Sequence, residues 1–174
     1  MAAQASSTSS SSTSLTIWIL VGLVLGLGCG FVLNTTTAES HSVNGPGGTT
    51  TLLAVTRSTE WKAAIAVAPV TDRAYYDTKY AETFMKTPRE NPEGYEHVSL
   101  VKRAKDLHGR LLLVHGTYDD NVHPQNTWAF ADELVKAGKP FDMMIYPMRK
   151  HGIGDRAARR HLYNKVLEFW KLYL

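Results

Sequence analysis

The chain has 174 residues, which leaves room for one folded domain, and its net charge of +3 is too small to indicate a nucleic-acid-binding protein. Three arginines, at positions 156, 159 and 160, cluster near the end of the chain, but no aromatic platform accompanies them, so they are interpreted as a solvated helix face. The only cysteine, Cys29, excludes an intrachain disulfide and a cysteine-based metal site.

The amino-terminal third differs in composition from the rest. Residues 1–14 are rich in Ser and Thr and predict a disordered tail, because they contain almost nothing to bury. Residues 15–33 are apolar and uncharged. As a helix they would measure roughly 28 Å at 1.5 Å per residue, which is close to the hydrocarbon thickness of about 30 Å. The segment therefore predicts a single transmembrane helix, with a cleaved signal peptide and a buried soluble helix as the alternatives.

Two features of this segment concern its partners and orientation. Gly22, Gly26 and Gly30 recur every four residues, a spacing that would let a second helix approach closely and form an oligomer. Charges on the flanks are too few to fix the orientation by the positive-inside rule. A single-pass membrane protein is expected, with the following domain on the extracytoplasmic side.

Residues 34–50 are rich in Thr, Ser, Gly and Asn and predict a linker. A short helix is expected next, with an apolar face made by Leu52, Leu53 and Val55, followed by a buried strand over residues 63–69. A Pro/Glu/Asn/Gly stretch to Gly94 then precedes a helix predicted over residues 99–107, with Ser99 as its N-cap.

The last seventy residues predict two successive strand–loop–helix units. Residues 111–114 predict a buried parallel strand, and a helix follows from Pro124 to Gly138, with its apolar stripe at positions 128, 130, 134 and 135. A second strand over 141–147, a loop over 148–154 and a helix over 155–173 come next. Residues 51–174 therefore predict a partial α/β-hydrolase fold of about three parallel strands and four helices, in which one sheet edge is left uncovered.

Two polar side chains follow these strands. Asp119 lies after the first strand and His151 after the second, about thirty residues later. Open α/β sheets keep their chemistry at the carboxyl ends of strands, and an Asp followed by a His is the order found in α/β-hydrolases. Neighbouring Asp120 and His123 are assigned to solvation and helix capping.

The motifs in this region resemble the dipeptidyl-peptidase IV branch of the prolyl oligopeptidase (S9) family of serine peptidases. The resemblance covers roughly residues 47–174, the C-terminal part of the catalytic domain. It is carried by Ile65-Ala-Val-Ala-Pro-Val70, Tyr75-Tyr-Asp77 with Tyr80, His115-Gly-Thr-Tyr-Asp-Asp-Asn-Val-His123, His151-Gly-Ile153 and His161-Leu-Tyr163.

The resemblance implies a role for each matching residue. Asp119 would be the acid of a catalytic triad and His151 its general base. The substrate residue before the scissile bond, Pro or Ala, would lie in an apolar pocket of this chain. One further side chain of this chain would orient the substrate backbone. The pocket residues are Val70, Tyr76, Tyr80 and Val122, and the orienting residue is Asn121. No cofactor or metal is implied.

The nucleophile departs from the family pattern. Where the family has Gly-x-Ser-x-Gly-Gly, this chain has Val43-Asn-Gly-Pro-Gly-Gly48, so Gly45 occupies the nucleophile position. Pro46 also lacks the N–H that an oxyanion hole needs. Ser42, Ser58 and Ser99 are the candidate substitutes, but none has the flanking glycines of the strained turn.

Three functional hypotheses follow. The first is a membrane-anchored serine peptidase of the dipeptidyl-peptidase type, inactive as this chain because the serine is absent. The second is a non-catalytic, membrane-tethered pseudo-enzyme or a truncated or fused gene product, which would act by binding prolyl peptides weakly or by joining a complementing chain. The third is a small bitopic protein that acts through its glycine-spaced span, but it leaves Asp119 and His151 unexplained.

Overall fold

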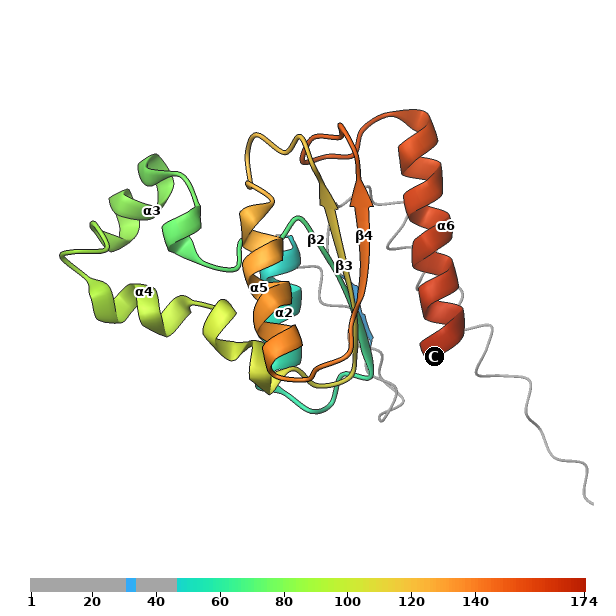
Figure 1. Ribbon diagram of the computed structural model, residues 1–174, viewed down its shortest axis with the longest axis horizontal. Coiled ribbons are helices and arrows are strands. Elements are labelled where there is room, and N and C mark those ends of the chain that lie inside the picture. Colours follow the sequence, from blue (N-terminus) through green and yellow to red (C-terminus); the bar gives the residue numbers. More distant parts are fainter. Residues whose placement is uncertain (1–30, 34–46) are drawn as a thin grey trace, which may run out of the picture.

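The computed structural model describes residues 31–33 and 47–174. Four strands of this part of the chain form one sheet in the order β1-β2-β3-β4 (Figure 1). They span Phe31–Leu33, Ala63–Val67, Arg110–Gly116 and Asp142–Tyr146. Strands β2, β3 and β4 run parallel, as the sequence predicts, whereas β1 is antiparallel to β2.

Helices cover both faces of the sheet. α2 (Gly48–Arg57) and α5 (Gln125–Lys136) lie on one face and α6 (Arg156–Tyr173) lies on the other (Figure 1). Two shorter helices, α3 (Thr78–Met85) and α4 (Pro92–Val98), project away from the sheet, and two 3-10 helices, η1 (Arg73–Tyr75) and η2 (Val101–Asp106), flank them. The result is the α/β layering that a parallel sheet needs, because both of its faces must be buried.

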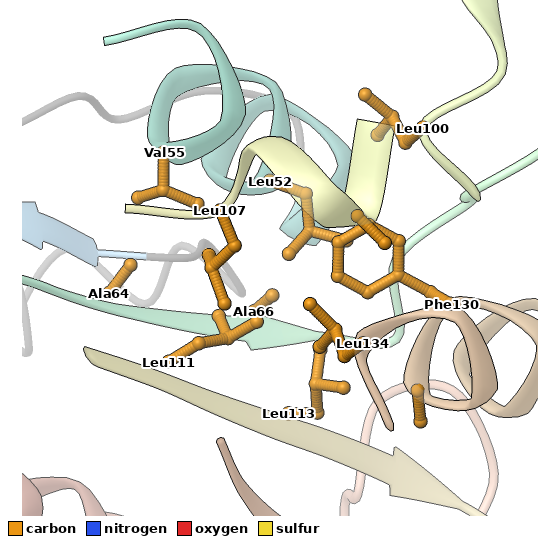
Figure 2. Packing of buried hydrophobic residues seen from close by; sticks show 12 residues of the cluster. Leu52, Val55, Ala64, Ala66, Leu100, Leu107, Leu111, Leu113, Phe130 and Leu134 are labelled. Carbon is orange, nitrogen blue, oxygen red and sulfur yellow. The ribbon is translucent and has the colours of Figure 1, made fainter. Parts of the chain in front are cut away.

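The core is divided by the sheet into two clusters. Alternate residues of β2 and β3 face α2 and α5, where Phe130 and Leu52 are fully buried (Figure 2). The intervening residues, among them Ile65 and Val114, face Val166 and the other buried residues of α6. Burial on both faces explains why these strands are almost continuously apolar in sequence.

The predicted transmembrane segment is described only at its end. Residues 15–30 lie outside the described residues, and the last three, Phe31–Leu33, form β1 rather than the end of a helix. Within residues 31–33 and 47–174, none of the helices has the length and apolar character needed to cross a membrane. β1 also pairs with part of the β2 edge that the sequence analysis expects to be uncovered.

Two other local predictions were wrong, and one helix was not predicted. α4 begins at Pro92, within the Pro/Glu/Asn/Gly stretch that ends at Gly94, with Asn91 as its cap. The helix predicted over residues 99–107 is a short 3-10 helix, and Ser99 ends α4 instead of starting the next helix. On α5, Trp128 and Val135 are 50% and 67% exposed, so the buried stripe is narrower than predicted.

Candidate active site

Asp119 lies in the loop that follows β3, and its carboxyl group is fully buried. Oδ1 accepts hydrogen bonds from the backbone N–H groups of Asn121 (3.0 Å) and Val122 (2.9 Å). Asp residues often fold the following backbone into a turn in this way. One carboxyl oxygen is therefore fixed by the loop itself, and Oδ2 is left for other partners.

His151 lies in the loop that follows β4 and meets Asp119 from the neighbouring strand. Its Nδ1 is 2.9 Å from Oδ2 of Asp119. The imidazole is 43% exposed, and its Nε2 has no hydrogen-bond partner among the described residues. With Nδ1–H donated to the carboxyl oxygen, Nε2 carries the lone pair and can accept a proton from a group that reaches it through the exposed side.

The two loops are held together by their backbones. The N–H of Tyr118 donates to the carbonyl of Arg149 at 3.0 Å, and the N–H of Met148 donates to the hydroxyl of Thr117 at 2.8 Å. Gly116 allows this approach, because a Cβ at that position would collide with the Arg149 carbonyl oxygen. The distance between Asp119 and His151 is therefore set by packing of the loops as well as by their own hydrogen bond.

Asp120 and His123 have the local roles that the sequence analysis assigned to them. Asp120 is exposed and forms an ion pair with Lys150 at 2.6 Å, which lowers the pKa of Asp120 through the hydrogen bond from the ammonium group. Nδ1 of His123 accepts the N–H of Gln125 at the start of α5. Neither side chain contacts the Asp119–His151 pair through a hydrogen bond.

His115 is a site residue that sequence reasoning missed. Its ring is fully buried, and Nε2 lies 3.1 Å from Oδ2 of Asp119 and 2.8 Å from the carbonyl oxygen of Val122. Nδ1 lies 2.6 Å from the hydroxyl of Thr127. Burial lowers the pKa of His115, and the hydrogen bond to Val122 and the charge of Asp119 only partly oppose this effect. The signals in the sequence were its place at the start of the His115–His123 motif and its four-residue spacing from Asp119.

The predicted substrate pocket is brought together in part. The rings of Tyr76 and Tyr80 meet edge to face with centroids 5.7 Å apart. The Tyr76 hydroxyl donates to Oδ1 of Asn121 at 3.3 Å, which links the tyrosines to the Asp119 loop. Val122 is buried in that loop, and Val70 is partly buried, with its N–H and carbonyl both bonded to Thr49. Among the described residues, no hydrogen bond joins Val70 to either tyrosine.

Arg73 changes the character of these tyrosines. Its guanidinium carbon lies 5.5 Å from the ring centroid of Tyr80 and 6.0 Å from that of Tyr76. Such cation–π contacts are favourable, but they place a positive charge beside a pocket that is expected to take an apolar residue.

Asn126 is a second residue that sequence reasoning missed. It is fully buried at the start of α5, where its Oδ1 accepts the N–H of Thr71 at 3.0 Å and its amide donates to the carbonyl of Tyr75 at 3.2 Å. Asn126 thus ties the tyrosine segment to the helix that follows the Asp119 loop. Thr71 and Asn126 are 55 positions apart, so the sequence gives no local sign of this contact.

Comparison with known proteins identifies the family. A model of the prolyl oligopeptidase family matches residues 44–174. This chain belongs to the prolyl oligopeptidase family. The resemblance to its dipeptidyl-peptidase branch is confirmed, because the chain is similar to dipeptidyl aminopeptidase A of Saccharomyces cerevisiae, with 44% identity over 113 residues. A probable dipeptidyl-aminopeptidase B of Talaromyces marneffei is 42% identical over 104 residues.

Solved structures of the family show the same fold. The crystal structure of Porphyromonas gingivalis dipeptidyl peptidase 4 matches 73% of this chain with a TM-score of 0.71 and 47% identity. A putative dipeptidyl aminopeptidase IV from Bacteroides ovatus matches the same share with a TM-score of 0.69 and 37% identity. The match covers 18% of each of these two chains. The yeast and Talaromyces matches cover 63% and 59% of this chain and 12% of the length of each relative.

The nucleophile elbow is the strained turn that carries the serine in α/β-hydrolases. The matching stretch of this chain, residues 43–48, is described only from Gly47. Gly45 and Pro46 lie outside the described residues. Gly47 precedes α2 with φ +81°, a conformation that L side chains rarely adopt. A Cβ on Gly48 would lie 2.7 Å from the carbonyl oxygen of Val67, so α2 begins in close contact with the carboxyl end of β2.

The candidate substitute serines do not reach His151 in the described part of the chain. Ser58 ends α2 at the opposite end of the helix from Gly48. The hydroxyl of Ser99 donates to the carboxyl group of Asp72 at 2.6 Å, and Ser42 lies outside the described residues. Within residues 31–33 and 47–174, there is also no group of three or more His, Cys, Asp or Glu side chains that could hold a metal ion.

Proposed function

We propose that this chain is a non-catalytic member of the prolyl oligopeptidase family, which keeps the acid–base pair of a dipeptidyl-peptidase-type serine peptidase without its nucleophile. One observation carries the proposal: Asp119 and His151 are joined by a 2.9 Å hydrogen bond, while a glycine stands at position 45. In the full mechanism, His151 would take a proton from a serine hydroxyl, and Asp119 would hold the ring and stabilise the imidazolium. Without that hydroxyl, no acyl-enzyme can form.

The described strands do not provide a nucleophile elbow. A nucleophile elbow needs a strand that runs directly into the turn before the helix. Within residues 31–33 and 47–174, the strand that precedes α2 is β1, which runs antiparallel to β2, and its last residue, Leu33, pairs with Ala63. The start of α2 contacts Val67, four residues further along β2. At 3.3 Å per residue these two points are about 13 Å apart, so β1 ends near the opposite end of β2 from the start of α2.

Binding and location form the remaining part of the proposal. Tyr76, Tyr80 and Asn121 keep one wall of the expected pocket, so peptides with Pro or Ala before the cut would bind weakly. Tethering to a membrane through the apolar residues before β1, 15–30, would place this domain at the bilayer surface. The uncharged character of that segment supports tethering, and a complementing chain that covers the part of the β2 edge left unpaired by β1 is compatible with it.

The test is release of a chromophore from Gly-Pro and Ala-Pro anilides by the purified full-length chain, with a fluorophosphonate probe to label any activated serine. We expect neither turnover nor labelling. Turnover and labelling that vanish in His151→Ala, and persist in the matched control His123→Ala, would overturn the proposal. His123 is a suitable control because it lies in the same loop as Asp119 without bonding to it.

A second variant separates a missing hydroxyl from a missing turn. Gly45→Ser combined with Pro46→Ala restores both the hydroxyl and the backbone N–H. We expect this variant to remain unlabelled, because β1, the strand that precedes α2 within the described residues, ends near the opposite end of β2 from the start of α2. Labelling of this variant alone would show that the elbow can form and that only the side chain is missing.

A further inference from the structure

The carboxyl group of Asp119 lies between two imidazoles. Oδ2 receives Nδ1 of His151 at 2.9 Å and Nε2 of His115 at 3.1 Å. The two rings differ in access, because His151 is 43% exposed and His115 is fully buried. His115 therefore cannot touch a substrate, and any influence it has on His151 must pass through Asp119.

The neighbours of His115 define where its proton lies. Nε2 faces two groups that can only accept, the carbonyl of Val122 at 2.8 Å and the carboxyl oxygen of Asp119 at 3.1 Å, so Nε2 must carry a hydrogen. Nδ1 faces the hydroxyl of Thr127 at 2.6 Å, which can donate. In the neutral Nε2–H tautomer the ring donates to the Val122 carbonyl, accepts from Thr127 at Nδ1, and keeps the polar N–H within 3.1 Å of Oδ2 of Asp119. Burial favours the neutral ring, since it lowers the pKa of His115.

The loop alone does not fix the carboxyl group. The backbone N–H groups of Asn121 and Val122 hold Oδ1, but the terminal torsion of an Asp side chain is broad and must be restrained at the second oxygen as well. His151 is a poor restraint, because its ring is partly exposed and belongs to another loop. His115 lies on β3, the strand that leads into the Asp119 loop, and its buried Nε2–H is within 3.1 Å of Oδ2.

We propose that His115, in the Nε2–H tautomer and fixed in orientation by Thr127, is a positioning residue that holds Asp119 so that Oδ2 faces Nδ1 of His151. The inference rests on the proposed function only in treating Asp119 and His151 as an acid–base pair. It requires no nucleophile, so it can be tested in the chain as it exists.

The test is NMR of the full chain labelled with ¹⁵N at histidine, which reports the tautomer of each ring and the proton on Nδ1 of His151. In the wild type, we expect His115 as the Nε2–H tautomer and a His151 Nδ1–H signal that is protected from exchange. Thr127→Val keeps the shape and removes the hydroxyl that fixes the ring through Nδ1, so the His115 ring should lose its fixed orientation and the protected His151 signal should be lost. The Nε2–H tautomer should persist, because Nε2 still faces two acceptors. Thr127→Ser should restore the wild-type spectrum.

Two variants of His115 test whether an N–H donor at this position is needed for the protected His151 signal. His115→Leu fills the space without a donor and should lose the protected His151 signal. His115→Gln can place an amide N–H near the position of Nε2 and should retain it. Thr56→Val is the matched control, because Thr56 is also a buried Thr but bonds within α2, to the carbonyl of Leu52.

The outcomes are decisive in either direction. Folded Thr127→Val and His115→Leu proteins that keep the protected His151 signal would overturn the inference. Equal loss in His115→Gln and His115→Leu would also overturn it, because the donor would then not be the cause. If the His115 variants fail to fold, the Thr127 pair decides. Chromophore release by the wild type would refute the proposed function and leave this result unchanged.

Discussion

Replacing Asp119 by alanine removes a carboxyl group that accepts hydrogen bonds from two backbone N–H groups and from Nδ1 of His151. The same carboxyl group lies 3.1 Å from Nε2 of His115. The N–H of Val122 is buried and would be left without a partner, and the N–H of Asn121 is only partly reachable by water. His115 would keep the Val122 carbonyl as its acceptor. A buried donor left unpaired costs about 1–3 kcal/mol. The expected loss in free energy of unfolding is therefore about 2–4 kcal/mol.

The assay is urea unfolding followed by far-ultraviolet circular dichroism at pH 7. Asp119→Asn keeps an oxygen for the two backbone N–H groups, so it should cost roughly half as much as Asp119→Ala. Asp120→Ala is the control, because the exposed Asp120 accepts only from Lys150, and its unfolding midpoint should not change. A loss below about 1 kcal/mol for Asp119→Ala, or equal losses in both Asp119 variants, would refute the reasoning.

Three further predictions concern the fold around the site. Gly48→Ala should lower the free energy of unfolding by about 1–3 kcal/mol, because its Cβ would meet the rigid backbone of Val67 at 2.7 Å; the urea midpoint measures it. Phe130→Ala should cost about 3–5 kcal/mol in the same assay, whereas Trp128→Ala, on the half-exposed side of α5, should cost little. The third prediction is a pH dependence. Because burial lowers the pKa of His115, the unfolded chain binds a proton below about pH 6.5 that the native ring does not. Stability should fall as the pH drops below about 6.5, and His115→Gln should reduce that slope.

The sequence predicts those parts of the site that depend on local pattern. Asp119 and His151 each follow an apolar run of strand length, and parallel strands bring their carboxyl ends to the same edge, so proximity followed from order alone. The parallel sheet with helices on both faces was predictable for the same reason. The roles of Asp119 and His151 in catalysis, and of the pocket residues in binding, stay predictions.

The features that sequence reasoning missed depend on contacts between distant residues. Asn126 joins Thr71 across 55 positions, and a polar residue at a helix start looks the same whether it caps locally or bonds to another segment. β1 comes from an apolar run that also suits a helix, because composition alone does not distinguish the two. Trp128 matched the helical stripe, but the narrow contact of α5 with the sheet leaves its ring half exposed.

The contacts of Asp119 explain how this carboxyl group can stay in place whether or not a nucleophile is present. Two of its four polar contacts are hydrogen bonds from backbone N–H groups of its own loop, and a third is the buried ring of His115, 3.1 Å from Oδ2, which is joined to α5 through Thr127. Only the fourth, the hydrogen bond to His151, belongs to the proposed acid–base pair. Loss of activity would remove the selection on His151 first, since the other three bonds still contribute to folding. An intact Asp119 loop is therefore weak evidence for catalysis, and the question of activity rests on the residue at position 45.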